Sequence, residues 1–210
     1  KYLAAALLVW GAVFSASVGF GVQQKTTIDN ADVKGAGATF PAPLYQHWIK
    51  EFNQQDGSFT LYYDAVGSGA GTKRFIAGDV DFGASDSAMN DEQMAAVKRG
   101  VQLIPATAGI IVLAYNIPGV DGELRLSREV YTDIFLGRIR YWNDQRIKDL
   151  NQSLDLPKLT IVTVTRSDSS GTTWAFTNHL SAISREWKVS GPGVGKKIDW
   201  PGISMAGRYN

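Results

Sequence analysis

The residues best suited to chemistry lie in one loop, residues 166–173, which reads RSDSSGTT. Arg166 carries a planar fork of donors that suits phosphate or carboxylate, and the serines and threonines add hydroxyl donors. Gly171 has no Cβ, so the backbone can come close to a ligand there. The loop has the composition of an oxyanion site, but Ser, Thr and Asp are equally usual in a plain helix cap.

The elements on either side of this loop would position it. Residues 159–165 (LTIVTVT) are rich in β-branched side chains and predict a strand, while residues 174–187 have the length and spacing of a helix. A helix start presents unpaired N–H groups and about half a positive charge, which stabilises a nearby anion. Taken alone, the segment is compatible with an anion site and with an ordinary capped helix.

Three further loops repeat the same design. Residues 35–41 (GAGATFP), 67–72 (GSGAGT) and 83–87 (GASDS) each offer a hydroxyl together with backbone N–H groups. Each follows an expected strand or precedes an expected helix, and ligands bind at that edge of open α/β sheets. The repetition favours an anion site over a simple helix cap.

Two nucleotide-binding motifs fail in these loops. In residues 67–73 (GSGAGTK) the threonine precedes the lysine, so the Walker order is not met. Phe40 stands where the dinucleotide fingerprint that begins at Gly35 requires its third glycine. A nucleotide site is therefore not expected.

The reactive side chains are few. The chain has no cysteine and two histidines, which excludes thiolate chemistry, disulfides and a structural zinc site. His179 would lie about 10 Å from Thr172 along the same predicted helix, too far to activate Ser170 easily. We interpret His179 and His47 as structural residues. No catalytic residue, metal or cofactor is expected.

Composition and patterning indicate an α/β protein. The net charge is +1, with 21 basic and 20 acidic residues spread along the 210-residue chain, so no nucleic-acid partner is expected. Strand-like and helix-like stretches alternate from Lys34 onward. Strands are predicted at residues 59–65, 80–84, 101–104, 110–115 and 159–165, and helices at residues 41–52, 70–77, 90–97, 128–136, 144–150 and 174–187.

The first residues form a separate segment. Residues 2–24 carry no charge and include an apolar block at residues 3–14, followed by small residues. We interpret residues 1–24 as a signal peptide, with an uncleaved N-terminal anchor as the alternative. Both interpretations place the remainder outside the cytoplasm.

In their order along the chain, these motifs resemble those of the phosphate-binding proteins of bacterial ABC importers. The resemblance runs from Lys34 to Pro201. It rests on residues 35–45, 67–73, 79–86 (DVDFGASD), 116–119 (NIPG), 136–142 (LGRIRYW), 166–172, 186–188 and 200–201. It implies a two-lobed periplasmic-binding-protein fold of type II topology, with a first lobe at residues 34–106 and a second at 107–210. Family members continue well beyond the position of Asn210, so we expect the second lobe to be incomplete.

The resemblance also implies a set of phosphate ligands: Thr39, Phe40, Ser68, Asp86, Arg166, Ser170, Gly171 and Thr172, with Asp168 holding Arg166 in place. Asp86 would give selectivity, because an ionised carboxylate only accepts hydrogen bonds. Phosphate near neutral pH keeps a proton to donate, whereas sulfate has none. A polar mismatch of this kind can cost a factor of about 10⁴ in affinity.

The function implied by the resemblance is that of a monomeric, periplasmic receptor. It would bind inorganic phosphate between two lobes and deliver it to the membrane subunits of an ABC permease, without being an enzyme. Two alternatives stay open: a secreted phosphomonoesterase built on the same cradle, and a membrane-anchored protein that sequesters phosphate.

Overall fold

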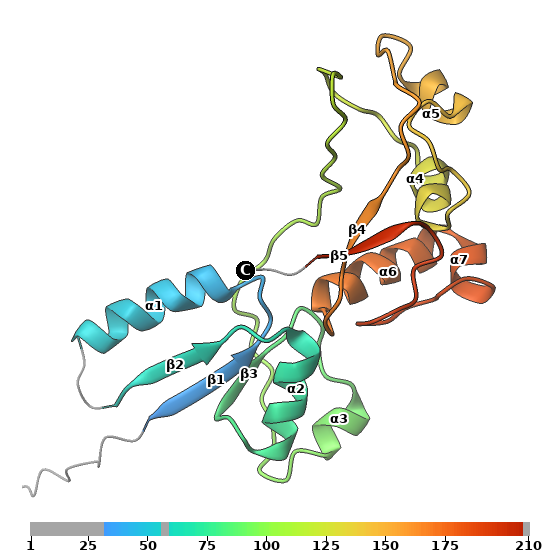
Figure 1. The fold of residues 1–210 in the computed structure, drawn as a ribbon. Coiled ribbons are helices and arrows are strands. Elements are labelled where there is room, and N and C mark those ends of the chain that lie inside the picture. The colour runs from blue at the N-terminus through green and yellow to red at the C-terminus, as the bar shows by residue number, and fades with distance from the viewer. Residues whose placement is uncertain (1–31, 56–58, 208–210) are drawn as a thin grey trace, which may run out of the picture.

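The computed structural model describes residues 32–55 and 59–207 of the chain. The predicted signal peptide or anchor, residues 1–24, lies outside the described residues. Within those ranges, no helix combines the length and the apolar composition needed to cross a membrane. The described chain forms two groups of elements, which Figure 1 shows as two lobes that meet near the starts of α2 and α6.

The first lobe is built on a parallel sheet of three strands in the order β2-β1-β3. Its elements are β1 (Val33–Gly37), α1 (Ala42–Gln55), β2 (Leu61–Asp64), α2 (Ser68–Ala77), β3 (Phe82–Ala84) and α3 (Asp91–Ala95). Helix α2 packs so closely on β1 that a Cβ at Gly71 would collide with the Cα of Gly37. This close approach fixes the start of α2 beside the end of β1.

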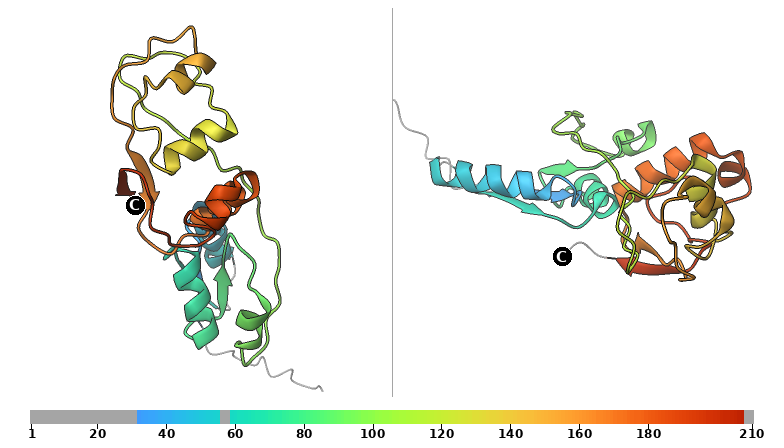
Figure 2. Two further views of the ribbon diagram at one scale, coloured as in Figure 1. Left: turned by 90° about the vertical axis from the view of Figure 1, so that its right-hand side faces the viewer. Right: turned by 90° about the horizontal axis from the view of Figure 1, so that it is seen from above.

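The second lobe contains the remaining elements: α4 (Arg128–Phe135), α5 (Gln145–Leu150), β4 (Thr163–Arg166), α6 (Gly171–Ile183), α7 (Arg185–Val189) and β5 (Ser204–Gly207). Strands β4 and β5 pair in parallel. Its core is a cluster of seven buried aliphatic residues: Ile117, Val130, Ile134, Ile139, Ile147, Leu156 and Ile161. Figure 2 shows α6 lying between this core and the first lobe, with its first turn next to α2.

The helices follow the sequence predictions closely, with one exception. The predicted helix 174–187 is divided into α6 and α7. The division falls at Ser184, which is extended (φ −131°, ψ 113°), and the Ser184 hydroxyl accepts a hydrogen bond of 3.1 Å from the Trp187 N–H. Ser184 therefore ends one helix and caps the next. Strands β1 and β5 were not predicted.

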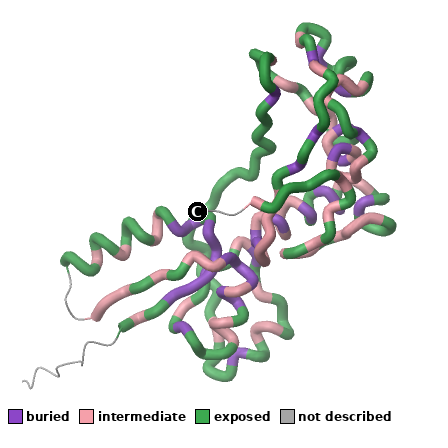
Figure 3. The backbone as a smooth tube through the Cα atoms, viewed as in Figure 1, coloured by how far each residue is buried: buried purple, intermediate pink, exposed green. Residues whose placement is uncertain are grey.

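The predicted strands at residues 101–104 and 110–115 are wrong. Residues 101–116 run as an extended connection without strand pairing, and residues 102–116 are all exposed (Figure 3). Ile110 is 89% exposed and Val112 is 74% exposed. A strand needs a neighbour to accept and donate its backbone hydrogen bonds, and no strand of the described ranges pairs with this segment. The predicted lobe boundary at residues 106/107 falls within it and stays a prediction.

Candidate anion-binding site

The loop after β1 is held firmly at the edge of the sheet. The Ala38 N–H donates to the Ala84 carbonyl at 2.8 Å, and the Tyr63 hydroxyl donates to the Ala38 carbonyl at 2.7 Å. Thr39 follows and is 8% exposed. These bonds fix the Thr39 hydroxyl at the side of the first lobe that faces the second.

The start of α2 supplies the next candidate, Ser68, which is 1% exposed. Its hydroxyl accepts a hydrogen bond of 3.3 Å from the backbone N–H of Asp86. The following residue touches the other lobe, because the Gly69 N–H donates to the Ser169 carbonyl at 2.9 Å. Ser68 therefore lies between the Asp86 loop and the second-lobe loop.

The second lobe contributes an arginine that is held on two sides. Asp168 accepts two hydrogen bonds from Arg166, at 2.7 Å from Nε and 2.5 Å from Nη2, so the guanidinium is held in a bidentate pair. The remaining nitrogen, Nη1, donates to the Thr39 hydroxyl at 3.1 Å across the two lobes. Asp168 thus holds the Arg166 guanidinium in a fixed direction, and its supporting role in ligand binding stays a prediction.

The first turn of α6 brings the last three candidates to the same point. Ser170 is 1% exposed and caps the helix, since its hydroxyl accepts from the Thr173 N–H at 3.2 Å. The Thr172 hydroxyl donates to Oδ2 of Asp86 at 3.2 Å. A Cβ at Gly171 would lie 2.7 Å from that oxygen, so only glycine lets the two loops meet this closely.

The surroundings of Asp86 shift the pKa of its carboxyl, with burial as the largest effect. The carboxyl is half-buried, and this desolvation raises its pKa above the usual 3.8. The hydrogen bond from Thr172 opposes the rise, followed by the positive charges of Arg166 and Lys196. A carboxylate that has lost part of its hydration is stabilised by any partner that donates a hydrogen bond to it.

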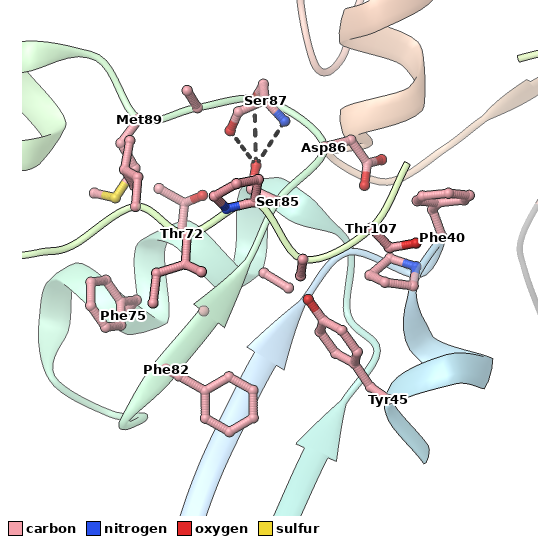
Figure 4. A pocket seen from close by; sticks show the side chains of 18 of the residues that line it. Phe40, Tyr45, Thr72, Phe75, Phe82, Ser85, Asp86, Ser87, Met89 and Thr107 are labelled. Carbon is pink, nitrogen blue, oxygen red and sulfur yellow. Dashed lines mark hydrogen bonds between the residues drawn. The ribbon is translucent and has the colours of Figure 1, made fainter. Parts of the chain in front are cut away.

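A cavity of about 1170 Å³ adjoins the site. Figure 4 shows Asp86 and Phe40 at one end and Phe75 and Met89 at the other. Its far wall is formed by residues 99–112, and Gly109 there packs against the Phe40 ring. Much of the lining is apolar, which suits an oxyanion poorly, so we place the candidate site in the polar cluster at its end.

The structure therefore brings the predicted set together. Seven of the predicted residues meet where the lobes touch: Thr39, Ser68, Asp86, Arg166, Ser170, Gly171 and Thr172. The ring of the eighth, Phe40, is exposed, so only its backbone N–H could contribute to the site. Their role as phosphate ligands stays a prediction. Two participants were missed: Ser169, through its carbonyl, and Lys196, which lies close enough to Asp86 to affect its pKa.

The histidines lie away from this cluster. His47 is on α1 and exposed. His179 is also exposed, stacks on the ring of Tyr131 and shares a 2.7 Å hydrogen bond with its hydroxyl. This placement agrees with the interpretation of both histidines as structural.

Comparison with known proteins places the chain among binding proteins. The model of the PBP superfamily domain matches residues 22–207. The phosphate-binding protein PstS of Pasteurella multocida is 45% identical over 170 residues, covering 80% of this chain and 48% of the relative. PstS of Methanocaldococcus jannaschii is 39% identical over 188 residues, covering 85% and 48%. The chain thus spans about half the length of these relatives.

A solved structure supports the fold. A putative phosphate ABC transporter substrate-binding protein from Clostridium perfringens, determined with bound phosphate, superposes with a TM-score of 0.50 at 18% sequence identity. The match covers 84% of this chain and 63% of that one. The two-lobed α/β architecture is therefore that of the periplasmic binding proteins.

Proposed function

The chain belongs to the PBP superfamily, and we propose that it captures inorganic phosphate between its two lobes and delivers it to an ABC-type permease. The observation that carries the proposal is the meeting of four loops from two lobes at one point. They bring a guanidinium that Asp168 holds, several hydroxyls and a helix start together with the Asp86 carboxylate. The names of the relatives described above support phosphate as the anion.

Each lobe contributes a different kind of group to the proposed ligand set. In the second lobe, Arg166 supplies guanidinium donors, and the first turn of α6 supplies N–H donors and the positive end of the helix dipole. Thr39, Ser68 and the Phe40 backbone supply donors from the first lobe. Because Arg166 already reaches Thr39 across the gap, an anion bound there would contact both lobes and hold them together.

Asp86 is proposed to recognise the proton that phosphate retains. An ionised carboxylate can only accept a hydrogen bond, so it favours an anion that still has a hydroxyl. A fully deprotonated anion such as sulfate would place two negative oxygens against each other in a half-buried site. We therefore assign selectivity to Asp86, and charge complementarity to the second-lobe loop.

No observation in the described residues favours hydrolysis of a phosphate ester. That reaction needs an activated nucleophile or a bound metal, and His179 is engaged with Tyr131. We propose binding without catalysis. The receptor is further proposed to act as a monomer in the periplasm, in contact with the membrane subunits of the permease.

Calorimetric titration of the protein with phosphate and, separately, with sulfate tests this function. We expect saturable binding of phosphate and much weaker binding of sulfate. Equal affinities for the two anions would remove the role given to Asp86, and absence of phosphate binding would overturn the proposal. Incubation with a generic phosphomonoester should release no phosphate.

A further inference from the structure

A lysine outside the predicted set is built into the edge of the site. Lys196 lies in the loop after α7, and its carbonyl accepts a hydrogen bond of 2.8 Å from the Ser170 N–H. Ser170 is the cap of α6 and is 1% exposed. The backbone of Lys196 is thereby fixed beside the helix start that contributes most to the candidate site.

The rest of the loop is anchored just as well. The Gly195 N–H donates to the hydroxyl of Thr177 at 3.1 Å, and the Trp187 indole N–H donates to the Gly193 carbonyl at 2.8 Å. Thr177 and Trp187 are fully buried. Two buried side chains and a helix cap therefore hold the residues that lead to Lys196, which makes its position a defined feature of the fold.

The anchored loop lies beside the residues that contact Asp86, because the Lys196 carbonyl is bonded to the Ser170 N–H and the Thr172 hydroxyl, two residues further on, donates to Asp86. Lys196 is partly buried, and this burial lowers its pKa, whereas attraction to Asp86 raises it. The same attraction lowers the pKa of Asp86. The ion pairs within the described ranges do not include Lys196, so its attraction to Asp86 acts beyond ion-pair distance.

The charges of the site explain why a second cation matters. Arg166 and Asp168 cancel each other in their bidentate pair. Tyr63 stays neutral, because burial and then its charged neighbours raise the pKa of its hydroxyl. Asp86 would then leave one net negative charge facing an incoming anion. The Lys196 ammonium makes the ionised groups of the cleft neutral in sum.

We propose that Lys196 is a second cation of the anion cleft, which offsets Asp86 and so strengthens and accelerates the capture of a protonated oxyanion such as phosphate. The inference rests on the proposed function. It differs from a structural role, in which the aliphatic stem of Lys196 would only pack against the loop and the charge would be irrelevant.

The neighbouring residue provides a matched control. Lys197 has the same side chain on the same loop but is exposed. Lys196→Met and Lys197→Met each remove one positive charge and keep a similar stem. Lys196→Arg keeps the charge and serves as a second variant, and thermal unfolding of each confirms folding before binding is measured.

Phosphate affinity and association rate are measured for these variants at low and high salt. We expect Lys196→Met to bind about tenfold more weakly, equivalent to about 1.4 kcal/mol, with a reduced association rate at low salt. Lys197→Met should stay within about twofold of the wild type. Lys196→Arg should retain most of the affinity. Equal losses in both methionine variants, or none in Lys196→Met, would overturn the inference.

A ligand-free measurement separates this inference from the proposed function. The pKa of the Asp86 carboxyl, followed by NMR, should rise in Lys196→Met and stay unchanged in Lys197→Met. If the wild type bound no phosphate but this shift appeared, the proposed ligand would be wrong while the pairing of Lys196 with Asp86 stood. An unchanged Asp86 pKa in Lys196→Met would refute the pairing whether or not phosphate binds.

Discussion

The hydroxyl of Thr172, in the first turn of α6, donates a hydrogen bond of 3.2 Å to Oδ2 of Asp86, which follows β3 in the other lobe. Asp86, which we propose to select the anion, is therefore in contact with the first turn of α6, which we propose to attract its negative charge. A hydroxyl can turn to donate elsewhere, so a ligand that offers its own proton can replace Thr172 on Asp86.

The first prediction concerns selectivity. Asp86→Asn replaces an acceptor by a group that also donates, so sulfate should no longer be rejected. We expect the ratio of phosphate to sulfate affinity to fall by about 10²-fold or more, within the range known for polar mismatches in binding sites. Calorimetry with both anions measures this ratio.

Asp79→Asn is the matched control, because Asp79 is an exposed carboxylate just before β3. Its anion preference should equal that of the wild type. If the ratio of phosphate to sulfate affinity were the same in Asp86→Asn and Asp79→Asn, Asp86 would not distinguish protonated from unprotonated anions.

The second prediction is a pH dependence of stability. Burial raises the pKa of Asp86 in the folded protein above its usual 3.8, so the folded state binds this proton more tightly than the unfolded state. The resulting stabilisation is complete below about pH 3.8 and is lost as the pH rises through the higher folded pKa. Ligand-free wild type should thus lose stability across this window relative to Asp86→Asn.

Urea unfolding of the two proteins between about pH 3 and pH 7 measures the effect. The two stability curves should diverge as the pH rises, with the wild type lower. Curves that stay parallel would mean that Asp86 titrates alike in both states. Saturating phosphate should stabilise the wild type at pH 7, because a ligand that binds the folded state raises its free energy of unfolding.

The third prediction isolates the geometry of Arg166 from its charge. In Arg166→Lys the charge stays, but a single ammonium cannot bond both oxygens of Asp168, Thr39 and an anion in fixed directions. We expect phosphate affinity to fall about tenfold or more, since the side chain must now be ordered when the ligand binds.

Arg74→Lys is its control. Arg74 makes an exposed ion pair of 2.7 Å with Asp64 in the first lobe, and such pairs contribute little. Its phosphate affinity should match the wild type. If the two lysine variants bound phosphate equally well, the fork of Arg166 would have no part in recognition.

Local signals in the sequence predicted much of this arrangement. Helices were predicted at residues 90–97 and 128–136, and the structure shows their local start signals: Asn90 and Gln93 form a capping box for α3, and the Ser127 hydroxyl caps α4. Caps depend on residues within one turn of each other, so a single sequence is enough to find them. The four loops were found for the same reason, because hydroxyls and glycines beside strands and helices are local patterns.

Strands were harder to predict from the sequence, because whether a segment forms a strand depends on the strands that pair with it. The glycine-rich β1 (VKGAG) has little strand propensity, yet it is the central strand, with β2 and β3 bonded to its two sides. Residues 110–115 (IIVLAY) have high propensity and form no strand in the described structure. Lys196 was missed for a similar reason, because its link to Ser170 joins distant parts of the chain.

The final prediction concerns that exposed connection. Ile104, Ile110 and Val112 are 78%, 89% and 74% exposed, on an extended backbone without strand pairing in the described ranges. Such a segment offers both apolar surface and free backbone groups to another chain. The protein should therefore associate in a concentration-dependent manner, with the monomer proposed above prevailing at low concentration.

The double variant Ile110→Lys/Val112→Lys should reduce that association, because charges on an extended, unpaired segment oppose its pairing with another chain. Val189→Lys is the control, since Val189 is 70% exposed but lies on the short helix α7. Light scattering over a range of protein concentrations compares the three proteins. A wild type that stays monomeric at high concentration, or a control that lowers association as much as the double variant, would contradict a self-association role for residues 104–112.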